Sequence, residues 1–199
     1  SLPKGKGTVI VKHANPCGVS GKDNHLDSYK SALSCDPVSA FGGIVSCNFK
    51  ITKNLAIELN KLFLEVIIAN GFDDSAIKIL KAKKNLRLID GTNYTSKELL
   101  KFISFNQDIM IQSEDLNLFS TKNLKIVSKR KPTSKQLKDL IFAFNVCRYV
   151  KSNAIVLASN KTTVGIGSGQ PSRLDSCQIA INKMKKFNLQ TDNLVAASD

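Results

Sequence analysis

Long apolar runs and a signal-like N-terminus are both missing from this 199-residue sequence. A helix that spans a bilayer needs roughly 20 consecutive apolar residues, and no segment approaches that length. Residues 1–7 contain no apolar core of the kind found in secretory signals, so we interpret them as a linker. The sequence therefore predicts neither a membrane protein nor a secreted one.

Cysteine pairs with metal-binding spacing are also missing. The number of cysteines is odd, and none of them belongs to a Cys-x-x-Cys pair: Cys17, Cys35, Cys47, Cys147 and Cys177. This spacing indicates neither a zinc site nor a disulfide framework. Reduced thiols are typical of a cytoplasmic protein, which is the location that we predict.

Acidic residues are few beside the basic ones: 16 Asp and Glu against 29 Lys and Arg, for a formal net charge of +13. Such a surplus suits nucleic acid, a membrane surface or a small anionic ligand. The basic residues are spread along the chain, however, and aromatic residues are not interleaved with them as an RNA platform requires. A solvated lysine-rich surface is the simplest interpretation, and a small anionic ligand is favoured over nucleic acid.

Strand-like and helix-like segments alternate along the chain. Apolar and β-branched runs predict strands at residues 8–12, 43–47, 66–69, 86–89, 109–112, 124–128, 154–158, 163–166 and 194–197. Helical spacing predicts helices at residues 26–33, 52–63, 75–82, 96–103, 134–150 and 173–187. Thr133 and Gln136 form a capping-box pattern before the fifth helix. The alternation predicts an α/β protein of layered sheet and helices, with a lobe boundary near residues 114–123.

The first candidate site is the pair Lys12 and His13 at the close of the first predicted strand. Neighbouring residues point to opposite faces of a regular strand, so both serve one site only if the strand ends there. Pro16 favours that ending, and a strand end followed by a Pro-Gly loop often carries ligand groups. The alternative is a surface lysine beside a hydrogen-bonded histidine. Asn15 and Ser20 stand where a zinc deaminase has its glutamate and second cysteine, which excludes that chemistry.

Four further candidates are each open to a plain structural interpretation. Gly42 begins a glycine pair that permits close ligand approach or an ordinary turn. Glu65, before an apolar run, suits ribose hydroxyls or simple solvation. Asn153 offers a donor and an acceptor to a carboxamide, or forms an Asx turn. Arg173 follows a glycine-rich loop and suits a carboxylate, although the glycine at 169 breaks the dinucleotide spacing.

Taken together, these segments resemble the AICAR transformylase domain of the bifunctional AICAR transformylase/IMP cyclohydrolase family. The resemblance runs in order through residues 9–18, 36–45, 65–69, 83–87, 129–133, 151–156, 165–170 and 197–199. It implies a cytidine-deaminase-like, layered α/β/α fold without zinc, in two lobes at residues 1–118 and 119–199. It also implies that the second lobe is incomplete at its C-terminus and that the cyclohydrolase domain lies upstream of Ser1.

The activity implied by the resemblance is the transfer of a formyl group from 10-formyltetrahydrofolate to the 5-amino group of AICAR, in de novo IMP synthesis. It implies no catalytic metal, a homodimer, and a structural potassium ion near Ser152 and Asp199. The matching residues carry three implied roles: Lys12, His13 and Asn153 in catalysis; Gly42, Glu65 and Asn153 at the nucleotide; Val38, Phe41, Arg173 and Leu174 near the folate.

Some positions depart from the pattern of that family. Asn70 replaces a usual proline, Pro171 replaces a usual Met or Gln, and residues 102–112 lack a common glycine pair. These departures, and the segments expected outside this chain, put activity of the chain alone in doubt. A basic nucleic-acid-binding module and an inactive structural fragment of the enzyme therefore remain as alternatives.

Overall fold

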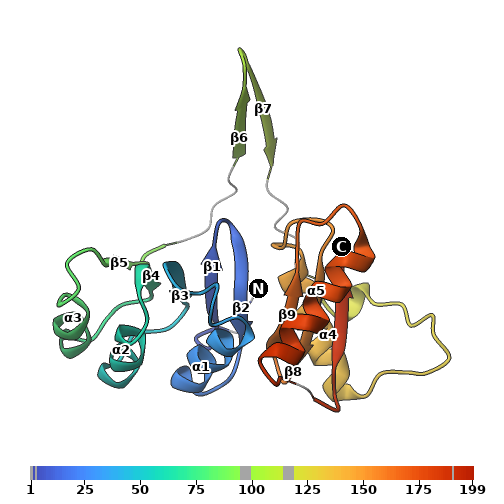
Figure 1. Ribbon diagram of the computed structural model, residues 1–199, viewed down its shortest axis with the longest axis horizontal. Coiled ribbons are helices and arrows are strands. Elements are labelled where there is room, and N and C mark those ends of the chain that lie inside the picture. The colour runs from blue at the N-terminus through green and yellow to red at the C-terminus, as the bar shows by residue number, and fades with distance from the viewer. Residues whose placement is uncertain (1, 3, 95–99, 114–118, 190) are drawn as a thin grey trace.

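One mixed β-sheet runs through the whole molecule. The computed structural model describes residues 2, 4–94, 100–113, 119–189 and 191–199, and within them eight strands follow the order β10-β8-β9-β2-β1-β3-β4-β5 (Figure 1). The strands are β1 (Thr8–Lys12), β2 (Asn15–Ser20), β3 (Gly43–Cys47), β4 (Leu64–Ala69), β5 (Arg87–Asp90), β8 (Ile155–Ser159), β9 (Thr162–Gly167) and β10 (Val195–Ser198). Only β3, β4 and β5 pair in parallel, and helices connect them. The other neighbours are antiparallel.

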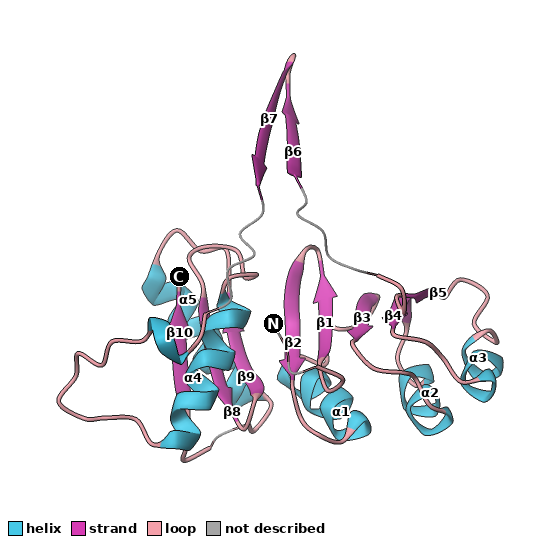
Figure 2. Cartoon of the chain, turned by 180° about the vertical axis from the view of Figure 1, so that it is seen from behind, coloured by secondary structure: helices cyan, strands magenta, loops and turns pink. Residues whose placement is uncertain are grey.

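Helices cover the sheet, as Figures 1 and 2 show from opposite sides. They are α1 (His25–Cys35), α2 (Lys53–Asn60), α3 (Asp74–Leu80), α4 (Ser134–Cys147) and α5 (Arg173–Lys186), with a 3-10 turn η1 at Thr121–Asn123. In β8, Val156 and Ala158 pack into the core formed with α4, whereas Ile155 and Leu157 pack into the core formed with α5. Because successive strand residues face opposite ways, α4 and α5 lie on opposite faces of this part of the sheet.

The buried apolar residues form two main groups. One group joins β1, β3 and β4 to α1, α2 and α3, with Ile10, Val45 and Ile67 on a single face. The other lies between α4 and strands β8–β10, and includes Val19 and Cys35 from the first part of the chain. The sheet is continuous between the groups through the pairing of β2 with β9. The lobe boundary at residues 118–119 stays a prediction, because residues 114–118 lie outside the described part.

Two glycines bring α5 into direct contact with β9. A Cβ atom on Gly165 would lie 2.2 Å from the carbonyl oxygen of Ala180, and one on Gly167 would lie 1.9 Å from that of Ser176. Any side chain at either position would therefore collide with the helix backbone. This close packing fixes the first turns of α5 above the end of β9.

Most of the predicted elements are confirmed to within three residues. The capping box of α4 is present, with the Thr133 hydroxyl accepting from the Gln136 backbone and the Gln136 side chain accepting from the Thr133 backbone. Ser172 caps α5 by accepting from Asp175 N. Thr52 is the N-cap of α2, but its side chain makes no capping hydrogen bond. No helix of the described residues has the length and apolarity to cross a membrane.

The predicted helix at residues 96–103 is wrong where the structure describes it. Residues 100–103 belong to β6 (Leu100–Phe105), which pairs with β7 (Asp108–Ser113) in a separate antiparallel hairpin, and residues 96–99 lie outside the described part. Aromatic and β-branched residues that pair across the strands favour the hairpin over the helix. Figure 1 shows this hairpin standing away from the main sheet.

Two other predictions need correction. Residues 124–128, predicted as a strand, are irregular and pair with no strand of the described part; Ile126 and Val127 are 51% and 84% exposed, so the apolar residues of this segment are not buried as those of a core strand would be. The Pro-Gly loop expected after Lys12 is the start of β2 instead. The register of β1 and β2 shifts between Ile10 and Val11, and such a bulge tolerates Pro16 within a strand.

Candidate active site

A tight turn places Lys12 and His13 at the tip of the β1–β2 hairpin. His13 and Ala14 separate the strands and have φ values of 50° and 61°. Two successive left-handed residues form the turn that best matches strand twist, but non-glycine residues rarely adopt this conformation. Strain of this kind gathers at functional sites, where the surrounding structure holds it. The strand therefore does end where the sequence predicts.

Lys12 lies beside the glycine pair. Its ammonium group donates a hydrogen bond to the Phe41 carbonyl, and a Cβ atom on Gly42 would be 3.7 Å from Lys12 Nζ. Gly42 has a φ of 69°, and its N–H donates to the Phe63 carbonyl at 2.9 Å. The structure thus brings together three of the predicted residues, Lys12, Phe41 and Gly42.

Asn15 links the hairpin tip to a segment far away in the sequence. Its amide nitrogen donates to the His13 carbonyl at 3.3 Å, and its oxygen accepts from Lys151 N at 3.1 Å. The Lys151 carbonyl in turn accepts from Gly169 N at 2.7 Å. Residues 13, 151 and 169 are therefore neighbours. We did not predict this positioning role for Asn15; its signal in the sequence is an amide side chain with both a donor and an acceptor next to the catalytic candidates.

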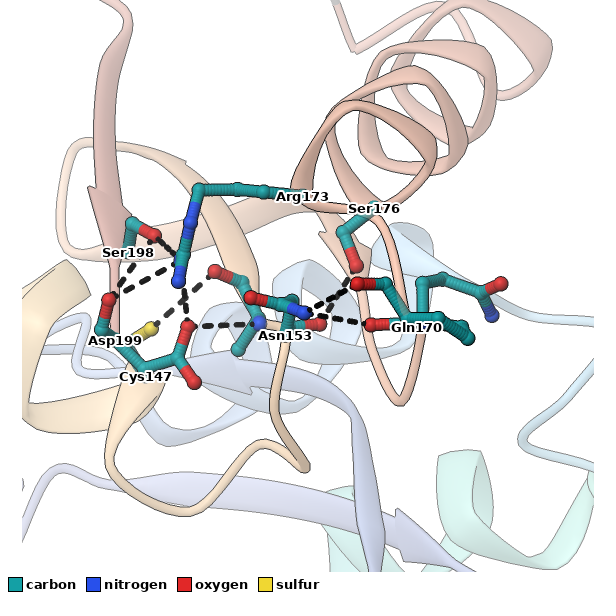
Figure 3. A network of polar contacts seen from close by, with 9 residues as sticks. Cys147, Asn153, Gln170, Arg173, Ser176, Ser198 and Asp199 are labelled. Carbon is teal, nitrogen blue, oxygen red and sulfur yellow. Dashed lines mark hydrogen bonds and ion pairs between the residues drawn. The ribbon is translucent and has the colours of Figure 1, made fainter.

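Asn153 is held rigidly by the loop before α5. Its side-chain nitrogen donates to the backbone carbonyls of Gln170 and Pro171 at 2.9 Å each. Its backbone carbonyl accepts from the Ser176 hydroxyl at 2.6 Å (Figure 3). Both N–H groups of the carboxamide are thus used inside the protein. The side-chain oxygen, an acceptor, is the atom left to meet a ligand.

Arg173 binds the last residues of the chain rather than pointing freely into solvent. Its Nη1 lies 2.7 Å from the Asp199 carboxylate and also donates to the Ser198 hydroxyl (Figure 3). The same carboxylate oxygen accepts from Ala154 N at 3.0 Å. Hydrogen bonds from Ser152, Ala154 N and Arg173, in this order of influence, hold the pKa of Asp199 well below its usual range. The family resemblance places Asp199 only beside the predicted potassium ion, and not among the catalytic or substrate-binding residues.

The remaining predicted residues are exposed. Glu65 lies in β4, close in register to Gly42. Val38 and Phe41 belong to the loop between α1 and β3, and are 65% and 58% exposed; the Phe41 ring packs against Phe63 at 5.1 Å. Leu174, in the first turn of α5, is 81% exposed. Hydrogen bonds and ring contacts among the described residues do not join the α1–β3 loop to Leu174.

Metal ligands do not gather in the described part of the chain, where no group of three His, Cys, Asp or Glu side chains has the geometry of a metal site. All five cysteines are free thiols. At Asp199, the N–H of Ala154 and the guanidinium of Arg173 already compensate the carboxylate. The predicted potassium ion therefore stays a prediction, and we derive no chemical step from it.

Lys12, His13 and Asn153 lie at strand ends and loops of a mixed α/β sheet, which is where proteins with such sheets usually place their ligand groups. The chain belongs to the AICARFT/IMPCHase bienzyme family, whose model matches residues 3–183. It is therefore a domain of the purine biosynthesis family that combines AICAR transformylase and IMP cyclohydrolase.

Bacterial proteins of this family are close in sequence. The chain is 46% identical over 193 residues to the bifunctional purine biosynthesis protein PurH of Persephonella marina, which covers 96% of this chain and 37% of that protein. It is 48% identical over 177 residues to PurH of Parvibaculum lavamentivorans, with 88% and 33% covered. PurH of Buchnera aphidicola is 46% identical over 194 residues. The chain thus spans about a third of the length of these relatives.

Proposed function

We propose that this chain forms part of the transformylase half of such a bienzyme, and that it serves the transfer of a formyl group from 10-formyltetrahydrofolate to the 5-amino group of AICAR. One observation carries the proposal: Asn15 ties the tip that bears Lys12 and His13 to the segment that leads into Asn153. Groups from both parts of the chain are thus held at one end of the sheet. The cyclohydrolase activity is assigned to the part of the relatives that this chain does not match.

The proposed chemistry needs a base, a cation and a carboxamide anchor. The amine of AICAR attacks the formyl carbon, the bond from that carbon to the folate nitrogen breaks, and one proton moves from the amine to the folate nitrogen. His13 takes the proton from the amine. Lys12 stabilises the oxygen anion of the tetrahedral intermediate, or protonates the departing nitrogen. Asn153 accepts a hydrogen bond from the AICAR carboxamide through its side-chain oxygen.

The binding roles that we propose are those implied by the family resemblance, and the exposure and charge of the residues support them. Gly42, directly before β3, and Glu65, near the start of the neighbouring strand β4, are proposed to contact the nucleotide. Val38, Phe41 and Leu174 present apolar surface to solvent, which suits the flat rings of the folate. Arg173 is proposed to contribute to the folate site while its Nη1 remains on Asp199. Preorganisation of both cosubstrates is worth roughly 7–11 kcal/mol of the barrier in well-oriented systems.

The wider arrangement that we propose is a cytidine-deaminase-like α/β/α fold in two lobes, at residues 1–118 and 119–199, in a cytoplasmic homodimer. Helices on both faces of β8 support the layered fold. The exposed β6–β7 hairpin supports a partner surface. Five free thiols support a reducing compartment.

A chimera tests the proposed reaction. The matching segment of Persephonella marina PurH would be replaced by this chain, and formyl transfer measured with AICAR and 10-formyltetrahydrofolate. We expect turnover, and a loss of roughly 10²-fold or more in kcat for Lys12→Ala and for His13→Ala. Lys78→Ala, an exposed lysine on α3, is the control and should leave kcat unchanged.

AICAR binding, measured by calorimetry, distinguishes a variant that does not fold from one that folds but does not catalyse the reaction. Variants that bind AICAR but do not turn over support the assigned roles. If a chimera that lacks both the Lys12 and His13 side chains kept full turnover, these residues would not be catalytic and the proposed mechanism would fail.

A further inference from the structure

Four lysines line a cavity at the opposite end of β8 from Asn153. The cavity has a volume of about 250 Å³ and lies between the loop before α1, the first turns of α4 and the β8–β9 turn. Its lysines are Lys22, Lys135, Lys138 and Lys161. Asn153 comes before the first residue of β8, whereas the turn follows the last one, so the strand of five residues separates the two places by roughly 15 Å.

Hydrogen bonds hold the walls of the cavity in place. The buried Asp139 carboxylate accepts from Asn160 N at 2.9 Å and from Lys161 N at 2.7 Å. These two turn residues have φ values of 51° and 54°, the conformation of a tight hairpin turn. From the other side, Gly21 N donates to the Lys161 carbonyl at 2.8 Å. The backbone around the lysines is therefore fixed, and only their side chains are free to adjust.

The acidic residues at the cavity offset only part of the charge of its lysines, because two carboxylates, Asp23 and Asp139, face four ammonium groups. Asp23 forms an ion pair with Lys6, outside the cavity lining, and is also attracted to Lys161. In the described part of the chain, none of the four lysines forms a salt bridge. The N-terminal end of α4 adds to the positive potential. Gathered ammonium groups repel one another, and a bound anion relieves that repulsion.

We propose that this cavity binds a small molecule through a phosphate or diphosphate group. Its volume falls short of the roughly 300–1,000 Å³ of pockets that enclose a drug-sized ligand, so it fits a phosphoryl group rather than a whole nucleotide. Lysine suits this role, because its ammonium group is a compact charge with three donors. The site is separate from the transformylase site and does not depend on it.

Pyrophosphate is the probe for the experiment. It would be titrated into the chain at 0.15 M ionic strength, a condition in which charges more than about 8 Å apart are largely screened. Calorimetry would compare Lys138→Gln/Lys161→Gln with the control Lys78→Gln/Lys185→Gln, which removes the same charge from exposed positions on α3 and α5. We expect the cavity variant to weaken binding by about tenfold or more, and the control by less than about twofold.

Three results would overturn the proposal. The first is no pyrophosphate binding at millimolar concentration. The second is equal weakening by the two double variants, which would point to the overall charge of the protein. The third is tighter binding of a ten-nucleotide RNA that displaces pyrophosphate with a steep salt dependence, which would assign the lysines to nucleic acid. Lys135→Gln, on the exposed surface of α4, provides a second variant should the turn variant fold poorly.

Discussion

At the scale of single residues, Asp36 shows how one buried charge connects two parts of the fold. Asp36 directly follows α1 in the sequence, and it is 4% exposed. It forms an ion pair with Lys183 of α5 at 2.7 Å and accepts from Ser39 N at 3.0 Å and from the Ser39 hydroxyl at 2.8 Å. Burial by itself raises the pKa of the carboxyl, but the hydrogen bonds from Lys183 and Ser39 outweigh it, and the net pKa is lowered.

We therefore expect Asp36→Asn to lower the free energy of unfolding at pH 7 by roughly 1.5–3 kcal/mol, the range for a hydrogen bond to a charged group. Because the folded pKa lies below the unfolded value of about 3.9, this contribution is present above that pH and is lost as the pH falls through the folded pKa. Urea unfolding from pH 7 down to pH 3 measures it. Asp192→Asn, at an exposed site, is the control. A difference between wild type and Asp36→Asn that stays constant over this range would contradict the prediction.

At the scale of elements, the contact of α5 with β9 depends on the absence of side chains. Gly167→Ala would place a Cβ atom 1.9 Å from the Ser176 carbonyl, on a helix turn that also holds Asn153. We expect a loss of about 3 kcal/mol or more, because the helix backbone must move. Gly91→Ala is the control, since its Cβ atom would meet only ordinary contacts from 3.5 Å. Denaturant unfolding of the two variants checks the difference; equal, small losses would show that α5 shifts freely.

Elements with a local signal were predictable from the sequence. Thr133 and Gln136 marked the start of α4, and the continuous apolar run at residues 66–69 marked the strand β4. The start of β2 was not predictable in this way, because Pro16 argues against a strand unless a bulge accommodates it. Residues 124–128 have the composition of a strand, but strand formation depends on a pairing edge, which composition does not reveal.

The candidate site was predictable in part for the same reason. Lys12, His13 and Gly42 belong to local patterns, and the structure places Lys12 beside Gly42. The link from Asn15 to Lys151 spans 136 residues, so neither local sequence segment indicates it. The pairing of Arg173 with Asp199 is also long-range, and it reduces the number of guanidinium N–H groups that Arg173 can offer to a ligand.

At the scale of the whole molecule, the β6–β7 hairpin is the part least explained by the chain alone. Its residues are all exposed, and strand alternation places four apolar side chains on one face, each more than half exposed: Leu100, Phe102, Ile109 and Ile111. A two-stranded hairpin by itself is at best marginally stable in water. A contiguous apolar face of this kind marks an interaction surface. In the proposed homodimer, a second copy of the chain covers this apolar face.

We expect Phe102→Ser/Ile111→Ser, a cross-strand pair on this face, to weaken self-association by at least about tenfold in the dissociation constant, because burial of each side chain is worth roughly 1.5–3 kcal/mol. Sedimentation equilibrium measures the change. The pair Ile103→Ser/Met110→Ser, on the opposite face of the same hairpin, is the control, since both residues are only about 40% exposed. Equal weakening by both pairs would show that folding of the hairpin, rather than this face, controls association. A wild-type chain that stays monomeric at about 100 μM, well above the micromolar range of ordinary specific complexes, would show that a second copy does not cover the face.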